Sequence, residues 1–433
     1  MLVWAADLLR DEGDKLILEG KRDLSRIAAD YALIHAPKDN DATSVHKARA
    51  RLGRLDYIEG DLKSARRNLL SSSFGVPKNY YTNLWLGYYY QLSGANVRAW
   101  ARYFQAFMVT NDSRQRILAI TPLCRLNNDP AFREGFTTQD AIELFEGRLP
   151  GEYHPIERYT REKDKFPGHA RLVEMFINSA SYSSSGAQLA GQGLSEYFGR
   201  ANVICVEYHI GEKTLLADGR SNQRMKFYEA NGYSAVLDGT NAFTGIDEFS
   251  GPDEIKMKTG NGEPSVGVAR VRIFPALRED SIEAQPRQDP KWSIEGTPRR
   301  DGASISGTLE IKGPILPTSA RLHVLLCESA IMAFEGNSLM FHRNVVRAVL
   351  SPSGGQALGS DKANRGFEIK ADTVKISAAR TSALAEQAAK RPWPAPTYID
   401  RRTVQLVAFV QDMETKEILA VRRFTPVTGK KEN

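Results

Sequence analysis

The sequence predicts a multidomain protein in which an α-helical region, an α/β region and a β-rich region follow one another. Glycine and alanine recur at a spacing of 34 residues in the first third, as in helical hairpins stacked into an array. Residues 171–243 alternate apolar strand-like runs with helical patterns, which favours parallel strands covered by helices. From residue 302 onward, short alternating runs follow one another, which favours an antiparallel β-sandwich.

The composition is that of ordinary globular domains. With 433 residues, 42% of them hydrophobic and 25% charged, the chain is long enough for about two to four domains with cores of their own. The net charge of +6 is small, and Lys and Arg are scattered among Asp and Glu, so no nucleic-acid partner is expected. No apolar run approaches the roughly 20 residues that cross a bilayer, so no transmembrane segment is expected.

The first residues, MLVWAADLLRDEGDK, lack the basic segment that opens a signal peptide. We expect a cytoplasmic protein if Met1 is the natural start, and a cell-envelope or exported protein if it is not. The sequence leaves the oligomeric state open.

Residues 1–120 are predicted to form a tetratricopeptide-like helical repeat domain. The spacing of 34 residues is the period of that repeat, and its small residues let paired helices approach closely. Residues 2–36 are expected to supply a degenerate flanking unit, because two helical pairs alone bury too little surface. Two ordinary helical hairpins are the alternative. The matching positions are Leu52 and Leu86, Gly53 and Gly87, Gly60 and Gly94, Ala65 and Ala99, and Leu69 and Tyr103.

Aromatic residues gather in the second repeat and are the binding candidates of this region. Trp85, Tyr89 and Tyr90 fall in one predicted helix, and Arg98 falls in the next. Such residues can line a peptide-binding groove, since Trp, Tyr and Arg dominate the energetics of protein interfaces. Packing in the core of the repeats is the other interpretation.

Four parts are predicted after the repeats. Residues 121–168 form a helical connector and a polar linker, and residues 169–278 form the α/β domain. Residues 279–301 form a second linker, and residues 302–427 form the β-sandwich.

The α/β domain is predicted to open with a strand, a helix and a second strand, followed by another helix and a hairpin at Asp238-Gly239. The expected strands cover 171–180, 201–210, the hairpin at 234–243, and 267–277. The expected helices cover 186–197 and 221–231, and Gly232 is expected to end the second helix.

The sandwich is predicted to contain only short strands, except for an Ala-rich insert at 376–394 that is either a helix or a loose loop. Its strands are expected at 304–313, 320–329, 341–351, 366–371, 403–412 and 418–427.

Residues 171–245 resemble a divergent group of bacterial thioredoxin-like proteins, and the final domain is similar to the immunoglobulin-like module that follows such a domain in an outer-membrane-associated family. The resemblances cover roughly residues 170–425. The first is carried by Val173-Glu174-Met175-Phe176, Tyr208-His209, Gly232-Tyr233 and Asp238-Gly239. The second is carried by Phe341-His342-Arg343-Asn344-Val345-Val346-Arg347-Ala348 and Val407-Ala408-Phe409-Val410-Gln411-Asp412.

The sequence departs from the thioredoxin pattern at the positions that carry its chemistry. Ser181 and Ser184 stand where the resemblance places the C-x-x-C cysteines, and Ser234 stands where it places a proline that is usually cis. Thiol–disulfide exchange needs an activated thiolate and a second thiol, so a redox-inactive domain is expected. A trans peptide is expected before Ser234, because a cis bond without proline costs about 3 kcal/mol.

Three function classes are weighed for this chain, and no cofactor or metal is expected in any of them. A non-catalytic protein-binding or scaffolding protein is favoured, with a protein or peptide partner on the repeats or beside the vacant site through Tyr182 and Tyr233. The enzyme alternative joins Ser181 or Ser184 to His209, with Glu207 on the same strand face.

The third class is a thiol–disulfide-related protein whose partner supplies the thiols, acting through Cys205. Cys124, Cys205 and Cys327 lie in apolar surroundings without paired spacing, and buried hydrophobic packing is the simpler interpretation of all three.

Overall fold

The computed structural model shows an α plus β protein whose two compact units are described separately below. One unit, the helical unit, comprises Met1–Phe136 with Pro392–Pro394, and the other, the sheet unit, comprises Thr137–Arg391 and Ala395–Asn433. No described helix is both long and apolar enough to cross a membrane. The described residues are 21–35, 42–110, 112–129, 131–132, 170–179, 181, 184–211, 214–217, 219–230, 234–243, 273–274, 276–283, 291–333, 335, 341–359, 366–389 and 396–428.

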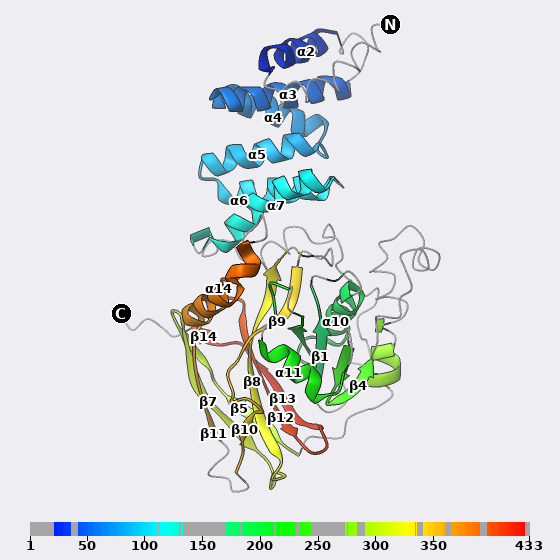
Figure 1. Cartoon of the computed structure of the whole chain (residues 1–433), viewed down its shortest axis with the longest axis vertical. Helices are drawn as coiled ribbons and strands as arrows, with labels where there is room; N and C mark the ends of the chain where they lie inside the picture. The colour runs from blue at the N-terminus through cyan, green and yellow to red at the C-terminus, as the bar shows by residue number, and fades with distance from the viewer. Residues whose placement is uncertain are drawn as a thin grey trace. The chain divides into compact units, whose positions relative to one another are not determined.

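The helical unit is a succession of antiparallel helices (Figure 1). Helix α3 packs on α4, and α5 packs on α6. The helices are α2 (Arg22–His35), α3 (Ala42–Glu59), α4 (Leu62–Gly75), α5 (Tyr80–Leu92), α6 (Asn96–Met108) and α7 (Ser113–Asn128). The predicted boundary at residue 120 falls inside α7.

The two hairpins are built alike at the spacing read from the sequence. A side chain at Gly53 would meet Leu69 Cγ at 2.6 Å, and one at Gly87 would meet Tyr103 Cε1 at 2.4 Å. Leu69 and Tyr103 are themselves fully buried. The recurring glycines therefore permit the helices of each pair to touch.

The turn inside each hairpin uses the second recurring glycine. Gly60 and Gly94 have φ of 88° and 73°, a left-handed conformation that a side chain disfavours. Directly after Gly60, Asp61 caps α4, because its carboxylate accepts the backbone N–H of Ser64 at 3.0 Å.

The sheet unit contains two sheets among its described residues. The larger has nine strands, in the order β13-β12-β8-β9-β2-β1-β3-β4 with β10 beside β8; the smaller has five, in the order β11-β7-β6-β14 with β5 beside β7. The strands of the larger sheet are β1 (Arg171–Ile177), β2 (Val203–His209), β3 (Ser234–Leu237), β4 (Thr240–Phe243), β8 (Ala320–Met332), β9 (Phe341–Val349), β10 (Gln356–Ala357), β12 (Val404–Asp412) and β13 (Ile418–Phe424). Those of the smaller are β5 (Ser293–Gly296), β6 (Arg299–Asp301), β7 (Ser304–Lys312), β11 (Gly366–Asp372) and β14 (Val427–Thr428).

The α/β part has the expected strand–helix–strand start. Strands β1 and β2 pair in parallel, and α10 (Ser185–Phe198) connects them. Strand β3 then pairs antiparallel with β1 and turns into β4 through Asp238 and Gly239, whose φ values are 46° and 94°. Two consecutive positive φ angles are typical of the type I′ hairpin that Asp-Gly favours.

The strands expected from two separate domains share the larger sheet. Strand β2 pairs in parallel with β9, in a ladder whose register is the single pair Glu207 and Val345. We call this place the β2–β9 junction. Residues 279–301, expected to be a linker, contain the end of a π-helical segment, η4 (Ala276–Glu283), followed by β5 and β6.

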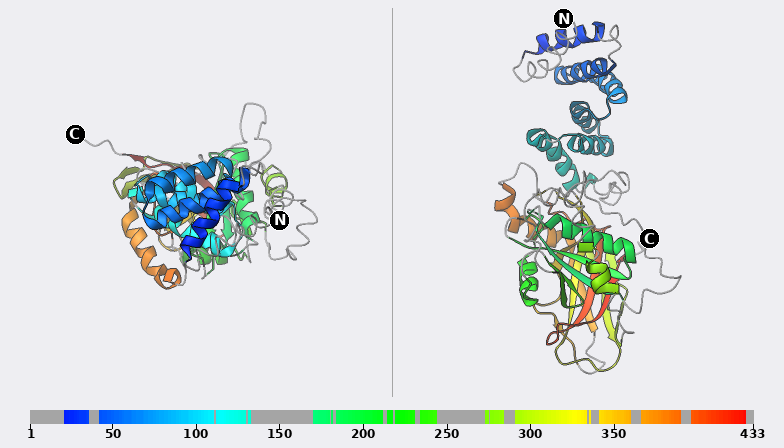
Figure 2. Two further views of the ribbon diagram at one scale, coloured as in Figure 1. Left: turned by 90° about the horizontal axis from the view of Figure 1, so that it is seen from above. Right: turned by 90° about the vertical axis from the view of Figure 1, so that its right-hand side faces the viewer.

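Apolar residues cover both faces of the larger sheet. Helices α10 and η4 bury one face of β1 to β3, with Met175, Leu194 and Leu277 among the contacts. The smaller sheet covers β8 and β12 on a core that includes Ile311 and Leu326. Helix α11 (Gly219–Phe227) lies on the opposite face, where the apolar core runs from β1 across to β12 (Figure 2).

Three expectations about local structure need correction or completion. The predicted strand 267–277 is helical where it is described, because Ile273, Phe274 and Leu277 lie on one helical face toward α10. Helix α11 ends at Phe227 rather than near Gly232, and Glu229 follows it with φ of 55°. The Ala-rich insert forms α14 (Thr373–Ala389).

Candidate functional site

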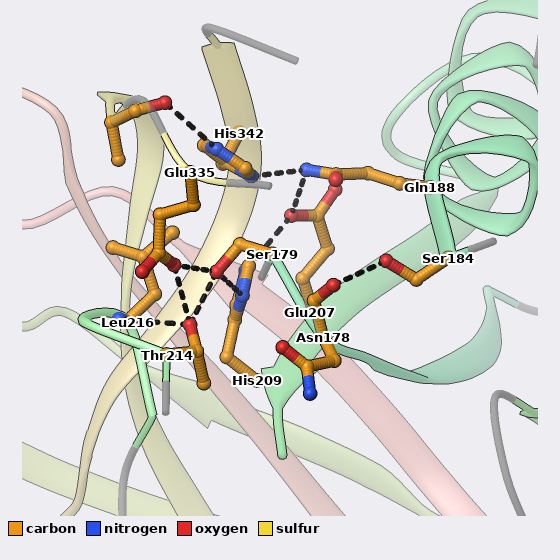
Figure 3. Close-up of polar contacts among 11 residues, drawn as sticks. Asn178, Ser179, Ser184, Gln188, Glu207, His209, Thr214, Leu216, Glu335 and His342 are labelled. Carbon is orange, nitrogen blue, oxygen red and sulfur yellow. Dashed lines mark hydrogen bonds and ion pairs between the residues drawn. The ribbon is translucent and has the colours of Figure 1, made fainter. Parts of the chain in front are cut away.

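A cluster of buried polar side chains lies at the β2–β9 junction. Glu207 and His209 come from the carboxyl end of β2, His342 from the start of β9, and Gln188 from α10 (Figure 3). Because β1 and β2 are parallel, their carboxyl ends meet at one edge, which is where open α/β sheets commonly place their sites.

The polar atoms of this cluster lie close to one another. Glu207 Oε2 lies 3.5 Å from His209 Nε2. The Gln188 amide nitrogen lies 2.9 Å from Glu207 Oε2 and 2.7 Å from His342 Nδ1. One ligand atom from each of Glu207, His209 and His342 lies within 4.8 Å of the other two, and all three residues are buried.

Hydrogen bonding fixes the tautomer of His342. Its Nε2 lies 3.1 Å from the Ala333 carbonyl oxygen, which can only accept, so Nε2 carries the hydrogen. Its Nδ1 therefore has a free lone pair, which accepts from the Gln188 amide. The same amide nitrogen also donates to Glu207 Oε2, so Gln188 links His342 to Glu207.

The tautomer of His209 is fixed in the same way, by the buried carboxylate of Glu335 acting through Ser179. Glu335 accepts the Thr214 hydroxyl at 2.6 Å, the Leu215 N–H at 2.8 Å and the Ser179 hydroxyl (Figure 3). Because Ser179 donates its hydrogen to Glu335, it can only accept from His209 Nδ1, 3.3 Å away. His209 Nε2 then has a lone pair, and it makes no hydrogen bond to the described residues.

Burial disfavours the charged forms of all three side chains. It raises the pKa of Glu207 well above the ordinary range. Burial, and next the neighbouring His342, lower the pKa of His209 well below its usual value. Burial also lowers the pKa of His342 to about 4. Both imidazoles are therefore neutral, the form that offers a lone pair.

The serines at the C-x-x-C positions make local contacts. Ser184 is buried at the start of α10, and its hydroxyl donates to the carbonyl oxygens of Asn178 and Ser181. It occupies the N-cap position of α10, but its side chain accepts no hydrogen bond from a helix N–H. Ser181 donates its own N–H to the Asn178 carbonyl at 2.9 Å. The hydroxyl beside His209 is that of Ser179.

Ser234, at the expected proline position, begins β3 and pairs with Phe176 of β1. Its side chain is buried, and its hydroxyl has no hydrogen-bond partner within the described part of the chain. Tyr182 and Tyr233, the binding candidates beside this site, lie outside the described residues.

The four candidates on the repeats fall into two groups. Trp85 is half-buried on α5 and contacts Tyr57 of α3 and Tyr88 edge-on. Tyr90 contacts Tyr89, and the exposed guanidinium of Arg98 on α6 lies 5.9 Å from the Tyr90 ring.

All three cysteines are buried and unpaired. Burial raises the pKa of Cys124 and of Cys205 to about 12, and it raises the pKa of Cys327 further. A thiol in that state is a poor nucleophile near neutral pH.

Sequence reasoning placed Glu207 and His209 on one strand face but missed the rest of the cluster. The pattern Glu-Tyr-His was the available signal, because side chains two apart on a strand point the same way. His342, Gln188, Ser179 and Glu335 join it only through the pairing of β2 with β9 and the packing of α10. No signal in the sequence fixes that pairing.

The fold and the site together define an α plus β multidomain protein with a buried cluster of two histidines and a glutamate. No protein-family model matches the sequence, and no curated protein matches it. Among solved structures, the chain is similar to HBP35 of Porphyromonas gingivalis, at 12% identity over 63% of this chain and 80% of that chain, with a TM-score of 0.38.

Two further solved structures are similar over parts of the chain. One is a domain of the outer membrane lipoprotein Omp28 from Porphyromonas gingivalis, at 15% identity over 33% of this chain and 92% of that one, with a TM-score of 0.22. The other is an O-GlcNAc transferase from Thermobaculum terrenum, at 16% identity over 52% of this chain and 40% of that one, with a TM-score of 0.25. TM-scores this low support no argument about function.

Proposed function

We propose that this chain is a non-catalytic protein-binding or scaffolding protein, and that its helical unit is a tetratricopeptide-like array that binds an extended peptide. One observation carries the proposal: half-buried aromatic side chains on α3 and α5, the first helices of consecutive hairpins, contact one another around Arg54, which is itself buried. We call this the α3–α5 aromatic surface; it comprises Arg54, Tyr57, Tyr81, Trp85 and Tyr88.

The contacts on this surface are regular. The Trp85 ring lies 5.3 Å from Tyr57 and 5.4 Å from Tyr88, both edge-on. The Arg54 guanidinium lies 5.4 Å from the Trp85 ring and 5.5 Å from the Tyr81 ring. Such contacts hold large side chains in place before a partner arrives, which reduces the entropy lost on binding.

The exposure of these rings suits a binding surface better than a core. Tyr57, Tyr81, Trp85 and Tyr88 are all half-buried, whereas Trp100 on α6 is fully buried. Half-exposed Trp and Tyr rings offer a large and rigid apolar area, which is why they dominate interface energetics. The indole nitrogen of Trp85 is buried, so Trp85 offers its ring alone. Tyr90 and Arg98 supply a second contact group on α5 and α6.

The sheet unit is proposed to combine a redox-inactive thioredoxin-like domain with an immunoglobulin-like sandwich. The parallel β1–α10–β2 start supports the first, and the packing of β8 and β12 against the smaller sheet supports the second. The absence of cysteine at 181 and 184 removes dithiol chemistry from this site.

The direction of the hydrogen bonds around His209 argues against the enzyme alternative. A nucleophilic serine must give its hydrogen to the histidine that activates it. Ser179 instead donates to Glu335 and accepts from His209, and Ser184 donates to main-chain carbonyls.

The binding proposal is tested by capturing partners from an extract of the source cells with the intact chain and with point variants. Trp85→Ala and Arg98→Ala each remove one contact group, and we expect them to deplete a shared set of captured proteins at least tenfold. Phe74→Ala is the matched control, because Phe74 is an aromatic residue of the same unit that is 84% exposed and lies on α4, off the proposed surface. Helical circular dichroism confirms that each variant is folded. Capture of identical sets by all four proteins would contradict the proposal.

A further inference from the structure

We propose that Glu207, His209 and His342 bind one divalent transition-metal ion and that this ion joins β2 to β9. Two imidazole nitrogens and one carboxylate oxygen face one another in a buried cluster, and each is a preferred ligand of zinc and related ions. The site is independent of the peptide-binding surface proposed for the helical unit.

The outer contacts of the histidines are those that metal ligands make. A coordinating histidine usually donates its other ring N–H to a carbonyl, a carboxylate or a similarly held group. His342 donates Nε2–H to the Ala333 carbonyl, and His209 donates Nδ1–H to Ser179, which Glu335 holds in turn. Both rings are thereby fixed: the Nε2 lone pair of His209 lies 3.5 Å from Glu207 Oε2, and the Nδ1 lone pair of His342 faces the Gln188 amide.

The distances are close to those of a metal site. Ligand atoms of a tetrahedral ion at about 2.0–2.2 Å lie about 3.3–3.6 Å apart. Glu207 Oε2 and His209 Nε2 are already 3.5 Å apart. The ligand atoms of the three residues lie within 4.8 Å of one another, so one side chain must shift by about 1 Å to bring all three to the distances of a tetrahedral ion.

Gln188 marks where the ion sits. Its amide nitrogen approaches both Glu207 Oε2 and His342 Nδ1, so it occupies the point that a shared ion would take. An ion at that point must displace the amide by about 2 Å, and rotating the amide by half a turn then presents Oε1, an oxygen that can coordinate. Gln188 is therefore the candidate fourth ligand.

Burial and charge indicate a structural ion. Glu207 is 3% exposed, and His209 and His342 are less so, so the ligands enclose the ion as in closed structural sites. The nearby Arg347 is already paired with Glu328 at 3.2 Å, and Glu335 holds the ring of His209 from behind through Ser179. Magnesium and calcium, which prefer all-oxygen sites, fit this ligand set poorly.

The position of the cluster predicts what the ion does. The β2–β9 ladder has a single registered pair, so few main-chain hydrogen bonds hold the junction. An ion that takes ligands from α10 and β2 on one side and β9 on the other ties the two halves of the larger sheet together. Ion binding then stabilises the sheet unit by mass action.

Calorimetric titration of the chelator-treated, tag-free chain with Zn²⁺ alone tests the site. We expect one Zn²⁺ per chain, no binding of Mg²⁺, and at least hundredfold weaker Zn²⁺ binding in Glu207→Gln and in His342→Gln. Ser179→Ala should bind about 10–100-fold more weakly, since it releases the ring of His209. His323→Gln is the matched control, because His323 is a buried histidine of β8 that stacks on Phe409 at 4.9 Å and belongs to no described ligand cluster.

Glu207→Gln keeps the shape of the side chain and an oxygen that can accept the Gln188 amide hydrogen, so it is expected to fold even if His342→Gln does not. Co²⁺ titration of the wild type adds a test that needs no variant: the visible spectrum should show ligand-field bands of a nitrogen–oxygen site at one equivalent. Absence of stoichiometric Zn²⁺ binding, unchanged affinity in Glu207→Gln, or equal loss in His323→Gln would overturn the proposal.

Discussion

Glu174 is a carboxylate in the middle of the buried strand β1, and its partners explain how it is tolerated there. Arg224 of α11 donates to its two oxygens at 2.8 and 2.9 Å, and Tyr228 donates a third hydrogen bond. Gln411 of β12 holds both Arg224 and Tyr228. This network ties together β1, α11 and β12, the last of which belongs to the opposite half of the sheet.

Removing the charge of Glu174 is expected to be costly, because Arg224 remains buried without its partner. Glu174→Gln should lower the free energy of unfolding by about 3 kcal/mol, measured by urea denaturation. Glu368→Gln is the control, since Glu368 pairs with Lys370 on the exposed face of β11 and should have little effect. Equal effects of the two variants would show that the Glu174 network is not important for stability.

The cysteines give a second prediction at the scale of single residues. With a thiol pKa of about 12 for Cys124 and Cys205, almost no thiolate exists at pH 8, and burial blocks the reagent as well. The folded protein should resist alkylation by iodoacetamide, whereas all three thiols should react in denaturant. Mass spectrometry counts the adducts. Rapid labelling of Cys205 in the folded protein would contradict this prediction and would support a function that uses its thiol.

At the scale of elements, the helical hairpins depend on contacts that only glycine permits. Gly87→Ala would normally favour a helix by up to about 1 kcal/mol through backbone propensity. Here the added methyl group would overlap the buried ring of Tyr103 at 2.4 Å. Overpacking of about 1–3 kcal/mol should outweigh the gain, so thermal unfolding should occur at a lower temperature.

Gly191→Ala in α10 is the control for that experiment. Its added carbon would meet the flexible Met175 side chain at 3.3 Å, so the same substitution should be tolerated better. A stabilising Gly87→Ala would mean that α5 and α6 are not in close contact at this point.

The start of α4 supplies a pH-dependent prediction. Hydrogen bonds from Ser64, chiefly from its backbone N–H, lower the pKa of Asp61. A lowered folded-state pKa means that the cap contributes stability above the unfolded value of about 3.9 and loses it as the pH falls through the folded value. Asp61→Asn should keep the cap and remove this pH dependence, whereas Asp61→Ala should lower the melting temperature at pH 7. Melting curves between pH 2 and 7 distinguish them, and identical curves for all three proteins would contradict the role of Asp61.

At the scale of the whole molecule, the chain divides into two compact units, each with its own core. Differential scanning calorimetry should therefore resolve two transitions. Gly87→Ala should shift only the transition of the helical unit, and Glu174→Gln only that of the sheet unit. A common shift of both transitions by either variant would mean that the units unfold together.

Much of the local structure follows from sequence patterns, because it rests on neighbouring residues. The spacing of Gly53 and Gly87 anticipated the paired helices, and Asp238-Gly239 anticipated the β3–β4 hairpin. The strand predicted at 267–277 was wrong because a short apolar run does not distinguish a strand from a buried helix.

The sequence by itself determined an α plus β multidomain chain, the order of its helical and strand-rich parts, and the pairing of Glu207 with His209 on one strand face. Only the tertiary structure joined β2 to β9 and so brought His342 and Gln188 to that glutamate. The physical reason is that strand pairing between distant segments depends on how whole apolar faces are buried, and no local propensity encodes it.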